Sequence, residues 1–496
     1  MTALTRRELL LLAAVAAPSA ARTRPAFAAP VQNYDDGSDA VPGRLVGDPE
    51  RVIVVGAGWA GLAVANALRN AGVDHVVLES RKRIGGRAHT VDIAGVPVDL
   101  GCSWIHGPIG NPMARFADQA GVRRTSGDVE LDSPRMRVFD AQLGRELTPF
   151  ERGPAFLHAL KFAEEDSGSI SDELGPRASV RDGAVVYLDR NGIDGVTRRP
   201  TVVLMKMLSE MTYGRDWRQM SLAHWAYSKR EPSYYGVGEG DFPVGGYRGL
   251  IRAMAGGGEV RLGHHVQAIK TGRRGVVVHA TAGKRTVRLH GSHVVVTVPL
   301  GVLQAGAIRF EPQLPAAKRG AIARVGFGAV EKVAMLFDTP FWSDLDHTHI
   351  VFCAKSPKLE LPWWIDLNRT HGFPGLKVFY GGPFARSLRT WSAGERLELT
   401  LTRLREILGR DIPRPSGFRA TDWQRDPNSR GSYSSMLIGS TPDDNDTLAA
   451  PVHGRLLFAG EATSRVRHST ADGALSSGFR EAKRLLRQPA VAISAG

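Results

Sequence analysis

The sequence predicts an α/β fold with more than one domain, and three observations lead to this prediction. Its 496 residues exceed the size at which a single hydrophobic core keeps growing, so two domains are expected. A hydrophobic content of 43% and a charged content of 23% are typical of a globular protein. A β-branched strand at 52–55, a glycine-rich turn, an alanine-rich helix to about Asn70 and a second strand at 75–78 follow in order. This order is that of a parallel sheet.

The first 28 residues are predicted to be an export signal rather than part of the fold. Thr5-Arg6-Arg7 precedes an apolar run from Leu9 to Ala17, too short to span a bilayer, and Ala26-Phe27-Ala28 offers a cleavage site. The pattern resembles a twin-arginine signal, so we expect a bacterial protein of the periplasm or the extracellular space. A mitochondrial presequence or a basic tail is the alternative. No other stretch has about 18 uninterrupted apolar residues, so we expect no stable membrane insertion.

The formal net charge of +14 raises the question of an anionic partner. The arginines are scattered along the sequence rather than gathered in blocks, and no signature of a nucleic-acid-binding module is present. We therefore expect a solvated basic surface and no nucleic-acid partner. A binding module for anionic polymers stays as the alternative of another class.

Two cysteines, Cys102 and Cys353, exclude a disulfide framework and a multi-cysteine metal site. One bridge between them stays open, and no metal is expected.

The turn after the first strand has the spacing of a dinucleotide site. Gly56 permits a tight turn, Gly58 lets the backbone approach a pyrophosphate, and Gly61 lets helix and strand pack closely. The following helix offers its N-terminal amides to the phosphates. Glu79, about twenty residues on, is placed to accept from a ribose hydroxyl. The elements together predict a Rossmann-like dinucleotide-binding domain.

A second glycine turn follows at 81–87. Arg81 and Arg87 flank it, and through Gly86 it can wrap back on the same pyrophosphate. The cations favour a binding role for this turn as well.

The end of the chain carries elements that identify a family. A strand at 456–459 meets Gly460-Glu461, and a helix begins near Thr470 with Gly473-Ala474 in its first turn. Together with both glycine turns, these elements resemble the flavin-dependent amine oxidases, from about Arg51 to Leu486.

The resemblance implies FAD as the cofactor, held by a glutathione-reductase-type domain that the chain completes at its end. In that family Gly460 and Glu461 meet the pyrophosphate and ribityl region, the backbone at Ala471 faces the flavin ring, and Val266 lies on the adenine side. The FAD-binding domain is then interleaved with an α+β substrate-binding domain. The expected ranges are 1–28 for the signal, 29–48 for a linker, 49–130, 242–310 and 423–488 for the FAD-binding domain, 131–241 and 311–422 for the substrate domain, and 489–496 for a tail.

Two segments point to a branch of the family. The segment 99–107, DLGCSWIHG, resembles the one that polyamine oxidases carry beside the flavin, which implies flavin contacts for Ser103 and Trp104 and a substrate-channel position for His106. Without the resemblance, the favoured interpretation of His106 is a hydrogen-bonded structural histidine, and the match of the whole segment reverses this preference. In the segment 423–435, Tyr433 matches the first wall of the family's aromatic cage and Trp423 a tryptophan near the ring. The alternative is two ordinary core aromatics.

Two departures from monoamine oxidases are informative. Ser432 stands where those enzymes hold a cysteine bonded to FAD, so non-covalent FAD is expected. Thr470 replaces their second cage tyrosine, which implies a wider, more polar site, as in polyamine oxidases and the lysine-specific histone demethylases. The long helical insertion of those demethylases is missing. Polyamine oxidases are the closest match.

A lysine interrupts an apolar strand at 325–338. Lys332 shares its strand face with Val330, Ala334 and Leu336, a face that alternation predicts to be buried. The resemblance implies that Lys332 holds a water against flavin N5 and assists reoxidation. The alternative is a lysine whose stem lies on the strand while its amine reaches solvent.

The function that the resemblance implies is oxidation of an amine by hydride transfer to flavin N5. The imine is hydrolysed to an aldehyde and an amine, and dioxygen is reduced to hydrogen peroxide. Spermine or spermidine is the expected substrate, with a monoamine or an L-amino acid as alternatives. Glu239, Asp241 and the acidic run 164–166 are candidates for a negative channel mouth. The sequence leaves a monomer and a homodimer open.

Overall fold

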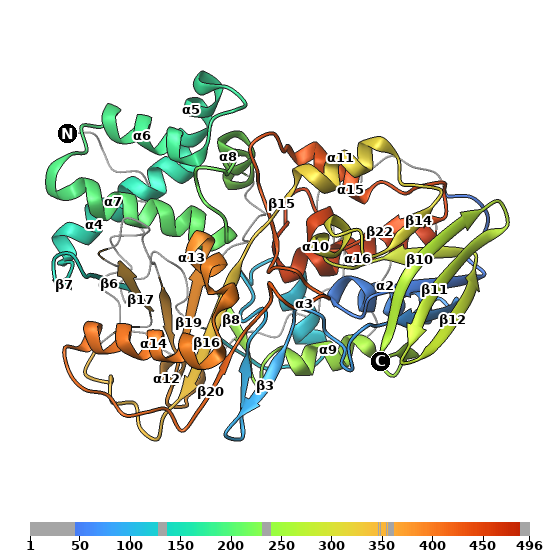
Figure 1. The fold of residues 1–496 in the computed structure, drawn as a ribbon, viewed down its shortest axis with the longest axis horizontal. Coiled ribbons are helices and arrows are strands. Elements are labelled where there is room, and N and C mark those ends of the chain that lie inside the picture. The colour runs from blue at the N-terminus through green and yellow to red at the C-terminus, as the bar shows by residue number, and fades with distance from the viewer. Residues whose placement is uncertain are drawn as a thin grey trace.

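The computed structural model describes residues 45–126, 136–230, 240–345, 347, 349–353, 355 and 362–486. The predicted export signal, most of the predicted linker, the C-terminal tail and Glu239 lie outside these residues. Within them the chain forms two sheet-based halves, with a four-stranded sheet at one end of the molecule and helices α4 to α7 at the other (Figure 1). None of the described helices is long and apolar enough to cross a membrane.

A parallel five-stranded sheet forms the nucleotide-binding half, which confirms the predicted Rossmann-like fold. Its strand order is β22-β13-β1-β2-β9. Side chains of β1 alternate between two buried cores, which is why the strand is apolar on both faces. Helices α2 and α16 cover one face, and their contact is so close that a Cβ at Gly478 would lie 2.3 Å from the Ala60 carbonyl oxygen. The elements are β1 (Arg51–Val55), α2 (Trp59–Asn70), β2 (Asp74–Leu78), β9 (Val260–Arg261), β13 (His293–Val296), β22 (Leu456–Phe458) and α16 (Ala471–Leu486).

A four-stranded sheet with the order β12-β11-β10-β14, antiparallel except for the parallel pair of β10 and β14, covers the other face of the parallel sheet. Its inner side chains, such as Ile269, Val276 and Val278, share a core with Ile53 and Val55 of β1. The strands are β10 (His264–Gly272), β11 (Gly275–Ala282), β12 (Arg285–Gly291) and β14 (Arg309–Glu311).

The second half is built on a seven-stranded sheet with the order β20-β16-β19-β18-β17-β6-β7. The predicted lysine-bearing strand is β16, and Val330, Ala334 and Leu336 lie in one core as expected. Helix α14 packs on the opposite face of the sheet. The elements are β6 (Met136–Asp140), β7 (Arg145–Glu146), β16 (Val330–Leu336), β17 (His349–Cys353), β18 (Trp363–Asp366), β19 (Gly375–Gly381), α14 (Ala393–Leu408) and β20 (Gly417–Ala420).

Helices α4 to α8 pack against this sheet (Figure 1), and two of them run into π-helical turns, η1 and η2. Helix α7 thus continues without a break into η2. Cys102 and Cys353 are both free thiols. The elements here are α4 (Pro149–Lys161), η1 (Phe162–Asp166), α5 (Ser167–Leu174), α6 (Val180–Arg190), α7 (Gly195–Lys206), η2 (Met207–Met211) and α8 (Leu222–Arg230).

The remaining elements are short. They are β3 (Thr90–Ile93), β4 (Val96–Asp99), α3 (Pro112–Gln119), β5 (Arg124–Ser126), β8 (Asp241–Pro243), α9 (Tyr247–Ala255), α10 (Leu300–Gln304), α11 (Ala316–Arg324), β15 (Gly326–Phe327), α12 (Leu367–His371), α13 (Gly382–Ser387), η3 (Leu388–Thr390), β21 (Ser434–Ser435), α15 (Pro442–Ala449) and η4 (Glu461–Thr463).

We expect Gly61→Ala to lower the free energy of unfolding by about 2 kcal/mol or more. A Cβ at Gly61 would lie 1.9 Å from the Gly56 carbonyl oxygen, so the first turn and α2 must separate. Gly249→Ala is the control, because a Cβ there meets only Val122 at 3.7 Å. Thermal unfolding of both variants checks this, and equal unfolding midpoints would contradict the packing role of Gly61.

Candidate active site

One cavity of about 990 Å³ extends between the two halves. This volume is at the upper end of the range for ligand sites, as a dinucleotide with a substrate requires. Gly61 is the one predicted site residue that does not line it, because it packs α2 against the turn. The predicted residues that line the cavity are Gly56, Gly58, Glu79, Arg81, Gly86, Arg87, Ser103, Trp104, His106, Val266, Lys332, Trp423, Tyr433, Gly460, Glu461, Thr470 and Ala471.

The first glycine turn leaves the start of α2 open toward the cavity. Gly56 has a φ of +111°, which few residues other than glycine adopt. No side chain caps α2 at Gly58, so the first amides of the helix stay available to an anion. The Glu79 carboxylate accepts from the Ala57 and Arg81 amides, at 2.8 Å each, and so braces the turn.

The second glycine turn lies directly against the first. The Gly85 amide donates to the Ala57 carbonyl at 2.7 Å, and a Cβ at Gly86 would lie 3.3 Å from the Gly58 Cα. Side chains at these positions would fill the space that the two turns enclose. The turns thus form a backbone-lined cradle, which fits the pyrophosphate of a dinucleotide such as FAD.

Glu461 joins three separate segments at this cradle. Its carboxylate accepts from Arg87 Nη1 at 2.8 Å, from Ser434 Oγ at 2.6 Å and from the Ser469 amide at 2.8 Å. Burial opposes ionisation, but the charge of Arg87 and these donors hold the pKa of Glu461 below its ordinary value. The end of the chain is thereby fixed to the second glycine turn.

Three further residues were predicted to contact the cofactor: Arg81, Val266 and Gly460. Arg81 has hydrogen-bond partners within the chain, and the other two lie at irregular positions of the backbone. Arg81 Nη2 donates to Asp426 at 2.6 Å and to Ser429 Oγ at 2.8 Å. Val266 lies at a β-bulge of β10, and Gly460 has a φ of +133°.

Lys332 lies at the other end of the cavity and is 8% exposed. Its Nζ donates to the Gly101 carbonyl and to Ser103 Oγ, the latter at 3.1 Å, and lies 4.4 Å from the Phe379 ring centroid. Burial, and then the charge of Lys377, lowers the pKa of Lys332 from 10.5 to about 7. The amine therefore exchanges its proton near neutral pH.

A second buried lysine lies beside Lys332 and was missed by sequence reasoning. Lys377 is 0% exposed and lies on β19, where it pairs with Ala334, while Phe379 pairs with Lys332. Burial lowers the pKa of Lys377 to about 8, although the nearby Asp99 carboxylate favours its charged form. The signal was present in the sequence, since Lys377 also interrupts an apolar strand.

Aromatic side chains form the walls around Lys332. Tyr433 donates its hydroxyl to the Thr212 carbonyl at 2.8 Å. The ring of Trp104 lies 5.4 Å from that of Trp363 and 5.7 Å from that of Phe379, edge to face. Trp363 and Phe379 were not predicted, because strand register brings them here from a distant part of the sequence.

His106 is a neutral imidazole in this wall. Its Nδ1 accepts from Trp104 Nε1 at 3.2 Å. Burial lowers the pKa of His106 to about 4. Both the structural and the channel interpretation of His106 fit this geometry.

Thr470 uses its hydroxyl at the start of α16. Its Oγ1 donates to the Arg467 carbonyl at 2.8 Å and accepts from the Gly473 amide at 3.0 Å. The hydroxyl is therefore a helix cap, which reduces the polarity that sequence reasoning expected at this wall.

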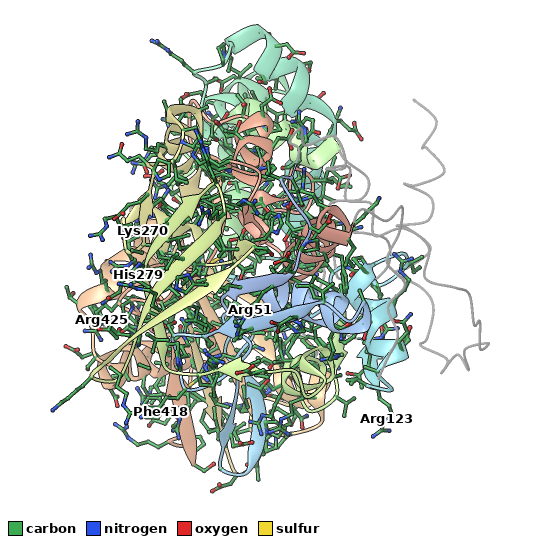
Figure 2. The ribbon with its side chains drawn as sticks, turned by 90° about the vertical axis from the view of Figure 1, so that its right-hand side faces the viewer. Arg51, Arg123, Lys270, His279, Phe418 and Arg425 are labelled. Atoms are coloured by element: carbon green, nitrogen blue, oxygen red, sulfur yellow. The ribbon has the colours of Figure 1, made fainter. Side chains whose placement is uncertain are left out.

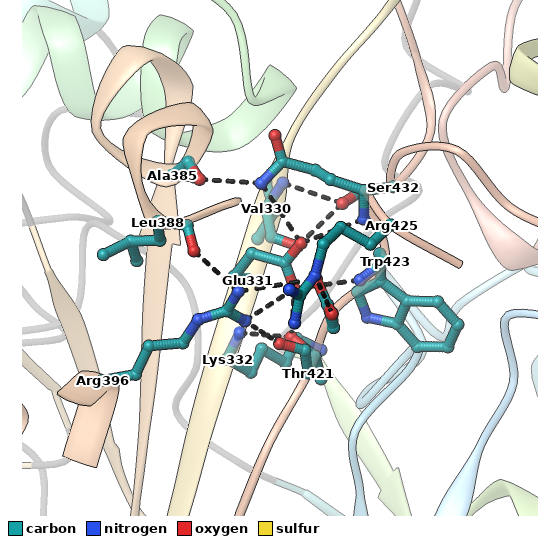
Figure 3. A network of polar contacts seen from close by, with 12 residues as sticks. Val330, Glu331, Lys332, Ala385, Leu388, Arg396, Thr421, Trp423, Arg425 and Ser432 are labelled. Carbon is teal, nitrogen blue, oxygen red and sulfur yellow. Dashed lines mark hydrogen bonds and ion pairs between the residues drawn. The ribbon is translucent and has the colours of Figure 1, made fainter. Parts of the chain in front are cut away.

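A buried network behind β16 fixes Trp423 (Figure 3). Glu331 is 1% exposed and accepts from Thr421 Oγ1 at 2.5 Å and from the amides of Trp423 and Gln424 at 3.2 Å each. Arg396 donates to the Thr421 carbonyl and lies 4.0 Å from Glu331. Adjacent residues of one strand thus point to opposite faces, since Lys332 faces the cavity while Glu331 holds the Trp423 turn.

The acidic residues that were candidates for the channel mouth do not all lie at the cavity. Glu164 lines the cavity, whereas Glu165 and Asp166 do not. Asp241 is buried in an ion pair with Arg124 and does not line the cavity. It is therefore not an acid of the cavity wall, contrary to expectation.

We expect Lys377→Met to raise the free energy of unfolding by about 1–3 kcal/mol at pH 7. Below about pH 8 the amine is charged in both the folded and the unfolded chain, so its burial disfavours folding in full. Between pH 8 and 10.5 only the unfolded chain stays charged, so the gain must shrink as pH rises.

Thermal unfolding at pH 7 and pH 10 checks this expectation. Lys284→Met is the control, because Lys284 is exposed. A Lys377→Met protein less stable than the parent at pH 7 would contradict the electrostatic interpretation.

Comparison with known proteins agrees with this geometry. The family described as "Flavin containing amine oxidoreductase" matches residues 59–486. Polyamine oxidase 4 of Oryza sativa subsp. japonica is 33% identical over 465 residues, covering 90% of this chain and 92% of the relative. A lysine-specific histone demethylase 1 homolog of the same plant is 33% identical over 457 residues, covering 88% of this chain and 52% of the relative.

Solved structures agree in fold. Wild-type putrescine oxidase with putrescine bound has a TM-score of 0.71 at 20% identity, covering 88% of this chain and 99% of that one. Since the family match and the relatives extend over most of the sequence, this chain belongs to the flavin-containing amine oxidoreductases, as a polyamine oxidase-like enzyme with FAD as its cofactor.

Proposed function

We propose that this enzyme oxidises a polyamine-type amine, such as spermine or spermidine, with dioxygen as the final electron acceptor. The observation that carries the proposal is one continuous cavity, in which the glycine cradle opens into a chamber with Lys332 and aromatic walls. The names of the relatives and of putrescine oxidase support an aliphatic amine as substrate.

Bound FAD supplies a two-electron acceptor that dioxygen regenerates, with release of hydrogen peroxide. The chain binds, orients and desolvates the amine. The rings of Tyr433, Trp363 and Phe379 attract a cationic or polar amine and pack its alkyl part. Above about pH 7 the Lys332 amine is neutral and can accept a proton at Nζ. The product is an imine, which water hydrolyses to an aldehyde and a shorter amine.

FAD is proposed to bind without a covalent bond. Ser432 stands before Tyr433, and its hydroxyl already donates to the Val330 carbonyl at 2.7 Å and accepts from the Val330 amide at 2.8 Å. A serine so engaged supports a structural role for this position rather than attachment of the flavin.

The charge around the helical end supports a cationic substrate. Residues 164–173 hold five acidic residues and no lysine or arginine, and they form the end of η1 and most of α5. Glu164 brings this acidic run to the cavity. A local negative field can steer a polyamine despite the net charge of +14.

A monoamine or an amino acid is the second candidate. Lys229 also lines the cavity, 5.8 Å from the ring centroids of Tyr213 and Trp225. A cation in the chamber disfavours a second ammonium nearby and favours a substrate with an apolar or anionic end.

We expect Lys332→Met to keep its FAD but to lower kcat at least about tenfold, because the chamber loses its proton acceptor. In the parent enzyme kcat/KM should rise with pH through about 7, as Lys332 releases its proton, and this inflection should vanish in the variant. Release of the flavin by acid precipitation measures FAD content and tests for a covalent bond at the same time.

Lys318→Met is the matched control. Lys318 is also buried, with a pKa lowered to about 7 by burial, but its Nζ donates to the Thr447 and Leu448 carbonyls outside the cavity. An unchanged pH profile in Lys332→Met would remove the proposed role of this lysine.

We expect Glu164→Gln to raise KM for spermidine about threefold to tenfold and to leave KM for benzylamine unchanged, because only a polyamine brings a second charge to the mouth. Glu165→Gln is the control from the same acidic run, since Glu165 does not line the cavity. Peroxide formation with spermine, spermidine, putrescine, benzylamine and several amino acids measures the substrate class. Turnover of amino acids alone would favour the second candidate.

A further inference from the structure

The acidic residues of this chain are unevenly distributed, and one long segment lacks them altogether. Residues 260–310 hold eight lysines and arginines, five histidines and no aspartate or glutamate. This one segment therefore carries more than half of the net charge of +14. The positions of the arginines alone do not reveal this segment, because its distinguishing feature is the absence of acidic residues between the basic ones.

Most of the segment forms the four-stranded sheet β12-β11-β10-β14, which faces the viewer in Figure 2 with Lys270 and His279 labelled. The register pairs His279 with Arg288 and Val277 with both Lys270 and His290, so these side chains share the outer face. The pKa of His279 is lowered by burial first and then by the charges of Arg288 and Lys270, which agrees with this grouping.

Much of this charge has no counter-charge in the described structure. Lys270 and Arg309 share Glu311, at 2.8 and 2.7 Å. Exposed arginines elsewhere are of both kinds, since Arg145 and Arg190 each pair with a glutamate whereas Arg252, Arg319 and Arg389 make no ion pair with any described residue. On the sheet, five exposed cations without such a pair lie close together in the sequence: Arg273, Arg274, Lys284, Arg285 and Arg288.

We propose that this face, defined by Lys270, Arg273, Arg274, Lys284, Arg285 and Arg288, binds a linear polyanion that carries oxyanion groups and no aromatic bases. Arg273 and Arg274 lie in the turn at one end of β11, and Lys284 lies in the turn at the other end, followed by Arg285 at the start of β12. The two ends are about 25 Å apart for the eight residues of β11. A compact anion cannot reach both ends, whereas an extended polymer contacts the whole face.

The composition of the face decides between polymers. Phe310 is the single Phe, Tyr or Trp residue in 260–310, and it packs against the core, so the only rings that the face offers to a nucleobase are the imidazoles of its histidines. Leu262 is its one exposed large hydrophobic residue, so a lipid bilayer finds no apolar anchor. Arginine pairs suit sulfate or phosphate groups along a polymer without bases.

The position of the face leaves the substrate chamber open. The sheet lies at one end of the molecule and helices α4 to α7 at the other (Figure 1). Glu164 and the chamber walls from η1 and η2 belong to the helical end. A bound polymer therefore anchors the enzyme without covering these walls, and the proposal does not depend on which amine is oxidised.

The test compares the FAD-loaded enzyme with a charge-reversed variant, Lys284→Glu, Arg285→Glu and Arg288→Glu. The control variant, Arg252→Glu, Arg319→Glu and Arg389→Glu, makes the same change of net charge at exposed sites on α9, α11 and η3. Binding to heparin is measured between 50 and 200 mM salt, with a thymidine oligonucleotide and phosphatidylglycerol vesicles as comparisons.

For about five contacts, the affinity of the parent for heparin should fall about a hundredfold over this salt range. The sheet variant should lose at least tenfold in affinity and the control variant less than twofold, with amine oxidation unchanged in both. Equal losses in the two variants would overturn the assignment, because net charge alone would then explain binding. Tighter binding to the oligonucleotide or to the vesicles than to heparin would also overturn it.

Discussion

The buried carboxylate of Glu461 is the contact on which the cavity depends. A buried charge costs several kcal/mol unless it is paired and hydrogen-bonded, and here Arg87, Ser434 and Ser469 supply the donors. These donors come from three stretches of chain that are far apart in sequence. The carboxylate is therefore satisfied only when the end of the chain returns to the glycine turn near its start, which also brings β22 into the parallel sheet.

Strand β16 carries two buried charges, and each of them needs hydrogen-bond partners in the same way. Glu331 and Lys332 are neighbours, both buried, and they point to opposite faces. Glu331 finds donors in the turn that carries Trp423, whereas Lys332 finds acceptors in Gly101 and Ser103. A strand with a charged side chain on each face is stable only when polar groups lie on both sides of it. The two charges of β16 therefore restrict which residues can surround the strand.

Local patterns in the sequence predicted the local part of this arrangement. The glycine turns, β1, α2 and the buried face of β16 follow from spacing and alternation, and the family resemblance named the residues that line the cavity. Lys377, Trp363 and Phe379 were missed because their position depends on pairing between strands that are distant in sequence. The hydroxyl of Thr470 was misjudged because a helix start competes for it. The basic sheet was missed because only the positions of the basic residues were considered, whereas the absence of acidic residues between them is also present in the sequence.

The π-helical turns η1 and η2 determine which side chains of their helices face the chamber. Each lies between α-helical residues and carries cavity-lining side chains, among them Glu164 in η1 and Leu208 in η2. A π-turn accommodates one residue more than an α-turn. Removing one residue from either turn would rotate everything beyond it by about 100° about the helix axis. Chain length within these two turns is thus as strict a requirement as residue identity for the wall that this chain presents to the substrate.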